Sequence, residues 1–206
     1  PGRSAIQSKI SKHLAGRNHF DLLDFLRRRL SRFFYEGTYE SWLTGLVSTL
    51  TKQARRLKPC IISTYLFTLA NNWCTSSRFG HAHDDCPFGC DDSDDISHVL
   101  TCPSFQRLFH RELGQVGTEI DYDDLLLFCR NDQPLSPVCV RYVLIYNYIL
   151  FHSFNSARHH CKPTRRSIAH QLILLATHCP TSRATISWVR SNQIFFPPQP
   201  PPLAAR

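Results

Sequence analysis

The sequence contains no methionine, and it contains no apolar run long enough to cross a membrane. A membrane-spanning helix needs about 20 consecutive apolar residues, and polar residues interrupt every apolar stretch here before that length. The start, Pro1-Gly2-Arg3-Ser4, has neither an initiator methionine nor the apolar core of a signal peptide. We expect neither a transmembrane nor a secreted protein, and the absence of methionine indicates an internal or C-terminal piece of a longer protein.

Acidic residues are missing from residues 133–206, which carry eight basic side chains. Residues 1–80 hold 13 basic and 4 acidic side chains, whereas residues 81–132 hold 3 and 12. The overall charge of +8 therefore hides a layout of +9, −9 and +8 along the 206 residues. Two basic regions beside an acidic one are what a polyanion such as RNA or DNA would contact, although such charges can also simply solvate helix faces.

Cysteine is present at nine positions, unevenly spaced, and three of them fall within residues 86–102. A secreted disulfide scaffold is usually shorter and denser in cysteine. The crowding therefore predicts a metal site in a reducing compartment, the nucleus or the cytoplasm. The other six cysteines are mostly embedded in apolar helical patterns, where cysteine behaves as a small buried hydrophobe.

Apolar residues make up 42% of the chain and charged residues 19%, a globular composition whose apolar spacing is mostly helical. We expect helices over residues 21–35, 40–57, 61–73, 105–113, 121–130, 138–157 and 164–178, the last ending before Pro180. The predicted fold is all-α with an inserted CCHC zinc knuckle. Its expected parts are a basic helical region (1–80), the knuckle (81–110), a C-terminal helical region (111–194) and a disordered proline-rich tail (195–206).

The most informative stretch is Cys86-Pro87-Phe88-Gly89-Cys90, followed by a run of aspartates and then His98 and Cys102. A tight Pro/Gly turn can direct both sulfurs of the first pair to one side. His98 and Cys102 are four residues apart, so they lie on one face of a helical turn, which Asp95 can cap. Cys86, Cys90, His98 and Cys102 together offer the four ligands that Zn²⁺ prefers.

With four protein ligands, one structural Zn²⁺ leaves no open coordination position for catalysis. The alternative interpretation is that a histidine and three cysteines fall together by chance, but this segment is too polar to bury three thiols in a core. His81 and His83 lie just upstream and could replace a ligand, although exposed loop histidines explain them equally well.

These residues carry a resemblance. The runs Trp73-Cys74-Thr75-Ser76-Ser77-Arg78-Phe79, Cys86–Cys90 and Asp94–Pro103 resemble the zinc-binding C-terminal region of LINE-type (non-LTR) retrotransposon reverse transcriptases. The resemblance covers residues 57–110, with C-x3-C here where that family usually has C-x2-C. It implies that Cys86, Cys90, His98 and Cys102 bind the metal and that the knuckle helps to hold RNA or target DNA.

No catalytic site is expected. Asp121-Tyr122-Asp123-Asp124 superficially resembles the paired carboxylates of a polymerase, but Asp121 takes the place of the required aromatic residue. An acidic first turn of a helix explains this run better. The sequence also lacks a Gly-x-Ser-x-Gly elbow, a Walker loop and a His-Glu-x-x-His motif.

Clusters of basic residues near aromatic residues are the candidates for phosphate contacts. They are Arg27, Arg28, Arg29, Arg32, Arg55, Arg56, Lys58, Arg158, Lys162, Arg165 and Arg166. The sequence thus predicts a non-catalytic, zinc-binding and nucleic-acid-binding segment of a LINE-like reverse transcriptase. The alternatives are a zinc-stabilised protein-interaction module, which could bind a partner through the proline-rich tail, and a degenerate retroelement remnant without activity.

Overall fold

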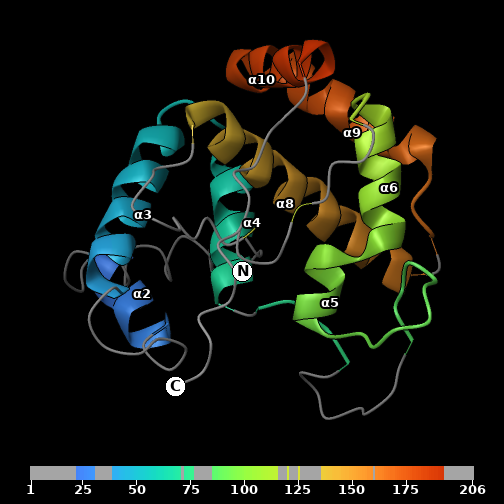
Figure 1. The fold of residues 1–206 in the computed structure, drawn as a ribbon, viewed down its shortest axis with the longest axis horizontal. Helices are drawn as coiled ribbons and strands as arrows, with labels where there is room; N and C mark the ends of the chain where they lie inside the picture. Colours follow the sequence, from blue (N-terminus) through green and yellow to red (C-terminus); the bar gives the residue numbers. More distant parts are fainter. Residues whose placement is uncertain are drawn as a thin grey trace, which may run out of the picture. The chain divides into compact units, whose positions relative to one another are not determined.

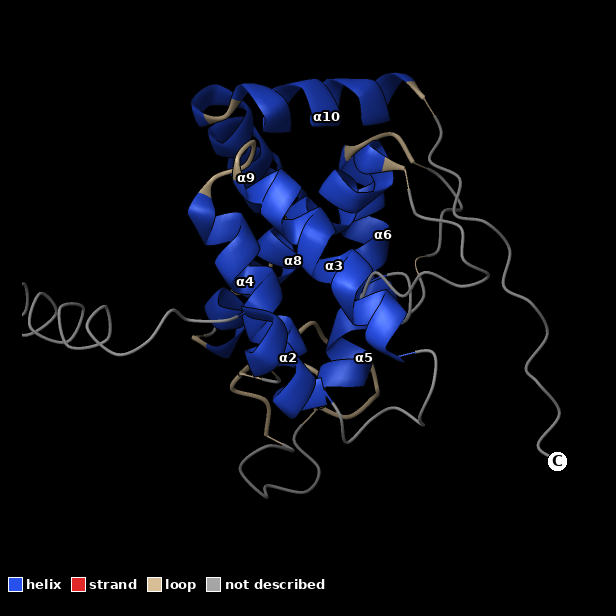
Figure 2. Ribbon diagram, turned by 90° about the vertical axis from the view of Figure 1, so that its left-hand side faces the viewer, coloured by secondary structure: helices blue, strands red, loops and turns tan. Residues whose placement is uncertain are grey.

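The structure, a computed structural model, describes residues 22–30, 39–70, 72–76, 85–115, 120, 125, 136–159 and 161–192. Over these residues the chain is mostly helical and forms no strand, which confirms the predicted all-α class (Figure 1, Figure 2). The helices are α2 (Leu22–Leu30), α3 (Tyr39–Ala54), α4 (Pro59–Leu69), α5 (Ile96–Thr101), α6 (Pro103–Glu112), α8 (Pro137–Arg158), α9 (Arg165–His178) and α10 (Pro180–Ser191).

The chain divides into two compact units, residues 1–47 and 48–206. Both of the boundaries expected at residues 80 and 110 fall inside the second unit. In the first unit, Leu26 of α2 and Leu43 and Leu46 of α3 are buried. The second unit holds the cysteine-rich segment and all helices from α4 onward.

Helix α8 is the centre of the second unit and packs against α4, α9 and α10. It is buried on most sides, because eleven of its apolar residues from Cys139 to Ala157 are buried. The expected range 138–157 agrees with the observed helix to within one residue at each end. Its β-branched and aromatic residues would also suit a strand, but its length favours a helix, and Ser136 caps it by accepting a hydrogen bond from the Cys139 amide at 3.2 Å.

Proline opens four of the helices: Pro59, Pro103, Pro137 and Pro180 occupy the first turn of α4, α6, α8 and α10. Proline suits this position because its fixed φ is helical and its missing N–H would have no partner inside the helix. Two expected boundaries are corrected by this preference. Helix α4 begins at Pro59 instead of residue 61, and α6 begins at Pro103 instead of residue 105.

The prediction that residues 164–178 form the last helix is wrong, since α10 follows α9 with only Cys179 between them. Pro180 begins α10 and does not merely end α9. Helix α10 crosses above α8 and α9 and packs against both (Figure 1, Figure 2). The helix expected over 121–130 and the tail over 195–206 lie outside the described residues, apart from Leu125, which is helical and buried.

Candidate metal centre

Cys86 and Cys90 lie on a short hairpin. The Cys86 amide donates to the Asp92 carbonyl at 2.9 Å, and an isolated antiparallel bridge joins Asp85 to Ser93. At the tip, the Gly89 amide donates to the Cys86 carbonyl at 2.9 Å. Gly89 has φ +77°, a left-handed conformation that a residue with a Cβ adopts only with strain. The glycine therefore allows the turn that brings Cys90 back towards Cys86.

The other two candidate ligands belong to α5 and the residue after it. Asp95 caps α5, because its carboxylate accepts from the His98 amide at 2.9 Å and from the Ser97 hydroxyl. Burial raises the pKa of Asp95, but the hydrogen bonds from Ser93, Ser97 and the His98 amide together lower it by more. The pKa of Asp95 is therefore below its usual value. The predicted cap is thus present, and it fixes the turn that carries His98.

Cys102 does not lie within the helical turn, as was expected, but between two helices. Helix α5 ends at Thr101, and Cys102 has φ −49° and ψ 116°, outside the helical region. The following residue is Pro103, whose ring disfavours helical ψ in the residue before it. Cys102 therefore ends α5 and begins α6, and its sulfur still faces His98.

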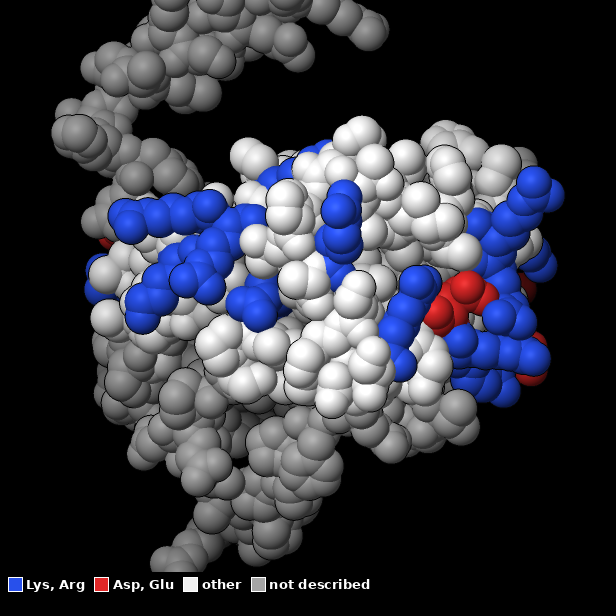
Figure 3. Space-filling view, turned by 90° about the horizontal axis from the view of Figure 1, so that it is seen from above, with Lys and Arg blue, Asp and Glu red and all other residues white. Residues whose placement is uncertain are grey.

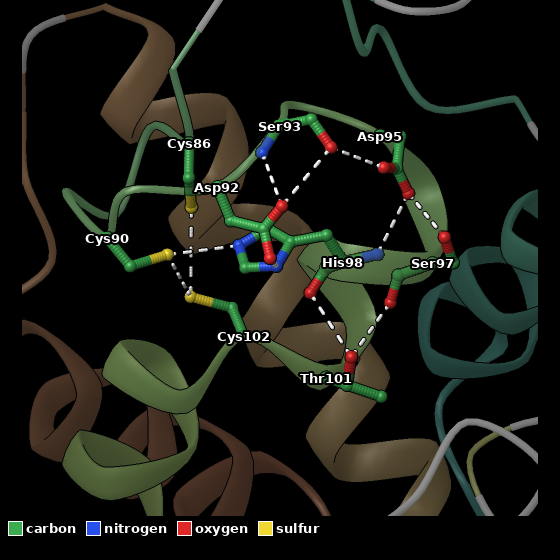
Figure 4. A network of polar contacts seen from close by, with 9 residues as sticks. All are labelled: Cys86, Cys90, Asp92, Ser93, Asp95, Ser97, His98, Thr101 and Cys102. Carbon is green, nitrogen blue, oxygen red and sulfur yellow. Dashed lines mark hydrogen bonds and ion pairs between the residues drawn. The ribbon is translucent and has the colours of Figure 1, made fainter.

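The four predicted ligands form one cluster (Figure 4). Their ligand atoms all lie within 4.8 Å of one another. Cys90 Sγ is 3.0 Å from His98 Nε2, and Cys102 Sγ is 3.7 Å from Cys86 Sγ and 3.5 Å from Cys90 Sγ. These cysteines are free of disulfide bonds. Residues from the hairpin, from α5 and from the α5–α6 junction thus converge on one point, where they could hold a metal ion.

A second carboxylate orients the histidine. Asp92 Oδ2 lies 3.0 Å from His98 Nδ1, on the opposite side of the ring from Cys90. This contact places a proton on Nδ1 and leaves the lone pair of Nε2 directed at the sulfurs. Histidines that bind metals are usually held in this way by an acceptor on the other ring nitrogen. Sequence reasoning treated Asp92 only as part of the acidic connection and missed this contact.

The thiols influence one another strongly. The hydrogen bond from Cys102 lowers the pKa of the Cys86 thiol to about 5. The same contact and burial raise the pKa of Cys102, and burial raises the pKa of Cys90. The cluster therefore favours one thiolate and two thiols, because neighbouring thiolates repel each other. A cation between the sulfurs would allow all three to lose their protons.

A buried ion pair attaches the hairpin segment to α8. Asp94 Oδ2 accepts from the Ser76 amide and the Ser76 hydroxyl, both at 2.9 Å, and from Arg158 Nη1 at 2.5 Å. The Asp94 side chain is 1% exposed and that of Arg158 is 32% exposed. The Arg158 guanidinium also lies 5.8 Å from the centre of the Phe154 ring. Arg158, expected to contact nucleic acid, therefore has a partner inside the chain.

Aromatic contacts also hold the hairpin against the helices. The Phe88 ring of the hairpin lies 5.2 Å from the Phe105 ring and 6.4 Å from the Phe154 ring. The buried Tyr146 hydroxyl of α8 donates to the Leu100 carbonyl of α5 at 2.9 Å. The cysteine-rich segment is therefore packed onto the helical core and is not a separate module.

The other predicted basic residues differ in what they contact. Arg28 pairs with Asp24 at 2.5 Å, and Arg165 pairs with Glu112. The Lys162 ammonium lies beside Gly89 at the hairpin tip. Arg27 is half-buried, and Arg55, Arg56, Lys58 and Arg166 are exposed or half-exposed. Arg32, the side chain of Arg29, His81, His83 and Asp121–Asp124 lie outside the described residues.

Comparison of the chain with protein-family models, with curated proteins and with solved structures gave no match. The resemblance to LINE-type reverse transcriptases therefore rests on the quoted motifs and stays a prediction. In the described part of the chain, no helix has the length and apolar character needed to span a bilayer.

Proposed function

We propose that Cys86, Cys90, His98 and Cys102 bind one Zn²⁺ ion. The observation that carries this proposal is the spacing of the sulfurs. Tetrahedral zinc with Zn–S bonds of about 2.3 Å has sulfurs about 3.8 Å apart. The separations of 3.7 Å and 3.5 Å match that spacing, and the orientation of His98 by Asp92 supports it. Three thiolates and an imidazole are a ligand set typical of zinc in structural sites.

The proposed zinc is structural. Four protein ligands complete a tetrahedron, so no position remains for a substrate or an activated water. The ion would join the hairpin to the α5–α6 junction and so hold the Phe88 ring against Phe105 and Phe154. The proposed role of the metal is thus to order residues 85–102 on the helical core, and the chain itself is proposed to be non-catalytic.

The proposed biochemical role is nucleic-acid binding, as part of a LINE-like reverse transcriptase. Two features support it: the motif resemblance over residues 57–110 and the excess of basic over acidic side chains outside residues 81–132. Exposed Arg and Lys bind phosphates by releasing the counterions of a nucleic acid.

Metal analysis tests the zinc proposal. The full chain, purified without chelators, is expected to contain about one equivalent of zinc, and Cys102→Ser is expected to lose most of it. Cys74→Ser is the matched control, because Cys74 is exposed and lies outside the cluster. Less than half an equivalent in the wild type, or a disulfide among the three clustered cysteines, would contradict the proposal.

Fluorescence anisotropy with a labelled RNA hairpin and a labelled DNA duplex tests nucleic-acid binding. The zinc-loaded chain is expected to bind at least one of them in the micromolar range or tighter, with affinity that falls steeply as salt is raised. No binding at low salt would remove this part of the proposal and leave the zinc site unaffected.

Protein binding is the second candidate function. Ile173 and Leu174 of α9 and Trp188 of α10 are 57%, 43% and 42% exposed. Large apolar side chains at the surface are common in interaction sites. Charged substitutions at these three residues test it. If they leave RNA binding intact but abolish binding to a protein that the wild-type chain binds, the result would favour this candidate.

A further inference from the structure

The α3–α4 turn meets the beginnings of α8 and α10. The Cys179 thiol, which caps α10, lies 3.6 Å from the Arg56 carbonyl. Arg141, in the second turn of α8, donates from Nε to the Thr185 hydroxyl of α10 at 3.0 Å. Three helices, α4, α8 and α10, therefore begin close together around Arg56 and Arg141. The first turn of a helix carries a partial positive charge, so this arrangement attracts anions.

Five basic residues come from the last turn of α3, the α3–α4 turn and the second turn of α8, and we call them the basic junction: Lys52, Arg55, Arg56, Lys58 and Arg141. The first three are exposed, and Lys58 and Arg141 are half-buried. Lys58 is also the N-cap residue of α4 and gives that helix no side-chain cap. Burial and the neighbouring charge of Arg56 lower the pKa of Arg141. The two guanidiniums are thus close enough to repel each other.

This repulsion is not relieved by a carboxylate in the described part of the chain. The ion pairs found there join Arg28, His98, Arg158 and Arg165 to aspartate or glutamate, and none includes a residue of the basic junction. Figure 3, which looks onto α10, shows basic side chains gathered on the left with almost no acidic ones among them. On the right, basic side chains surround acidic ones. An external anion would therefore relieve repulsion at the basic junction.

We propose that the basic junction is the surface that binds the phosphate backbone of a nucleic acid, with Arg56 and Arg141 as its central pair. The inference rests on the proposed function and assigns it to one surface. Guanidinium groups bind phosphate oxygens through paired hydrogen bonds, and two adjacent ones can contact successive phosphates of one strand. Several dispersed positive charges suit a repeating polyanion better than a single small ion.

The test compares variants of the zinc-loaded full chain by anisotropy with the labelled RNA hairpin. Arg56→Gln/Arg141→Gln is expected to weaken binding at least about tenfold at 0.1 M salt and to reduce the slope of log affinity against log salt by about 1.5. Lys52→Gln/Arg55→Gln removes two exposed charges of the same surface, away from the Thr185 contact, and is expected to act in the same direction. Arg107→Gln/Arg111→Gln, both exposed on α6 and neither part of the predicted phosphate contacts, is the charge-matched control, with an expected change of less than about threefold.

The outcomes separate the two proposals. If the wild type binds RNA or DNA but both junction variants behave like the control, the nucleic-acid function stands and the basic junction is wrong. If the wild type binds neither, both proposals fail. Competition by poly-aspartate as strong as that by unlabelled RNA would also overturn the assignment, because the surface would then accept any polyanion. Zinc content and thermal unfolding of each variant show that a loss of binding is not a loss of folding.

Discussion

A histidine becomes a good metal ligand when its other nitrogen is held, and here Asp92 does this. Its carboxylate lies 3.0 Å from His98 Nδ1 although the Asp92 side chain is 63% exposed. The contact selects the tautomer in which Nε2 is free to bind a metal and fixes the plane of the ring.

Asp92→Asn is therefore expected to lower zinc affinity about tenfold, the smaller end of what the loss of such a contact costs, because the carboxylate is largely exposed. Competition with a coloured chelator measures the affinity. Asp91→Asn, which removes an exposed neighbouring charge, is the control. Equal affinities of the two variants would mean that Asp92 acts only through its charge.

The thiols set how the proposed zinc binding depends on pH. Cys86, with its pKa lowered to about 5, is already a thiolate at neutral pH, whereas the pKa values of Cys90 and Cys102 are raised, so these two are protonated. Zinc must displace their protons, and about two protons are expected to leave per ion near pH 7. Affinity should then rise about a hundredfold per pH unit.

Calorimetric titration in buffers with different ionisation enthalpies counts these protons. A release close to zero or three would show that the three sulfurs titrate differently from the arrangement described above.

At the scale of elements, the ion pair of Asp94 with Arg158 connects the hairpin segment to α8. Arg158→Met leaves a carboxylate that is 1% exposed with only the Ser76 donors, so unfolding by urea is expected to show a loss of about 3 kcal/mol. Arg165→Met is the control, since Arg165 is 53% exposed and its pair should contribute no more than about 1 kcal/mol. A similar loss in both variants would argue against a buried role for Asp94.

The sequence predicted the elements well where apolar periodicity is long, and less well where one residue has two roles. Helix α8 agrees with its expected range because twenty residues of continuous pattern define it. Helix α10 was missed because Pro180 can end one helix or begin the next, and only packing against α8 and α9 decides between them. The cluster of Cys86, Cys90, His98 and Cys102 was predicted because the spacing of these residues is local. Asp92 and Arg141 were not, because an aspartate in an acidic run and an isolated arginine give no signal until the fold brings their partners near.

At the scale of the whole molecule, the second unit has two sources of stability. Helix α8 is enclosed by α4, α9 and α10, and its buried Asn147 accepts from the Thr68 hydroxyl at 3.3 Å, which in turn accepts from Trp73 Nε1 at 3.1 Å. The hairpin and α5, in contrast, have few buried apolar residues of their own, and the proposed zinc would hold them.

Removal of the metal is therefore expected to act locally. After chelation, hydrogen exchange measured by mass spectrometry should accelerate in residues 85–102, whereas α8 should keep most of its protection, because the contacts of α8 with α4, α9 and α10 do not involve the cluster. Loss of protection throughout the second unit would instead mean that zinc binding and folding of the core are one event.

Cys102 ends α5, begins α6 and contributes its sulfur to the candidate metal site, and its carbonyl accepts from the Gln106 amide at 2.9 Å. Three residues later, the Phe105 ring is fully buried against Tyr146. One residue added or removed in a helix rotates everything beyond it by about 100°. An insertion or deletion within α5 or the first turn of α6 would therefore turn either a candidate ligand or a core side chain towards solvent, and we expect neither to be tolerated between His98 and Phe105.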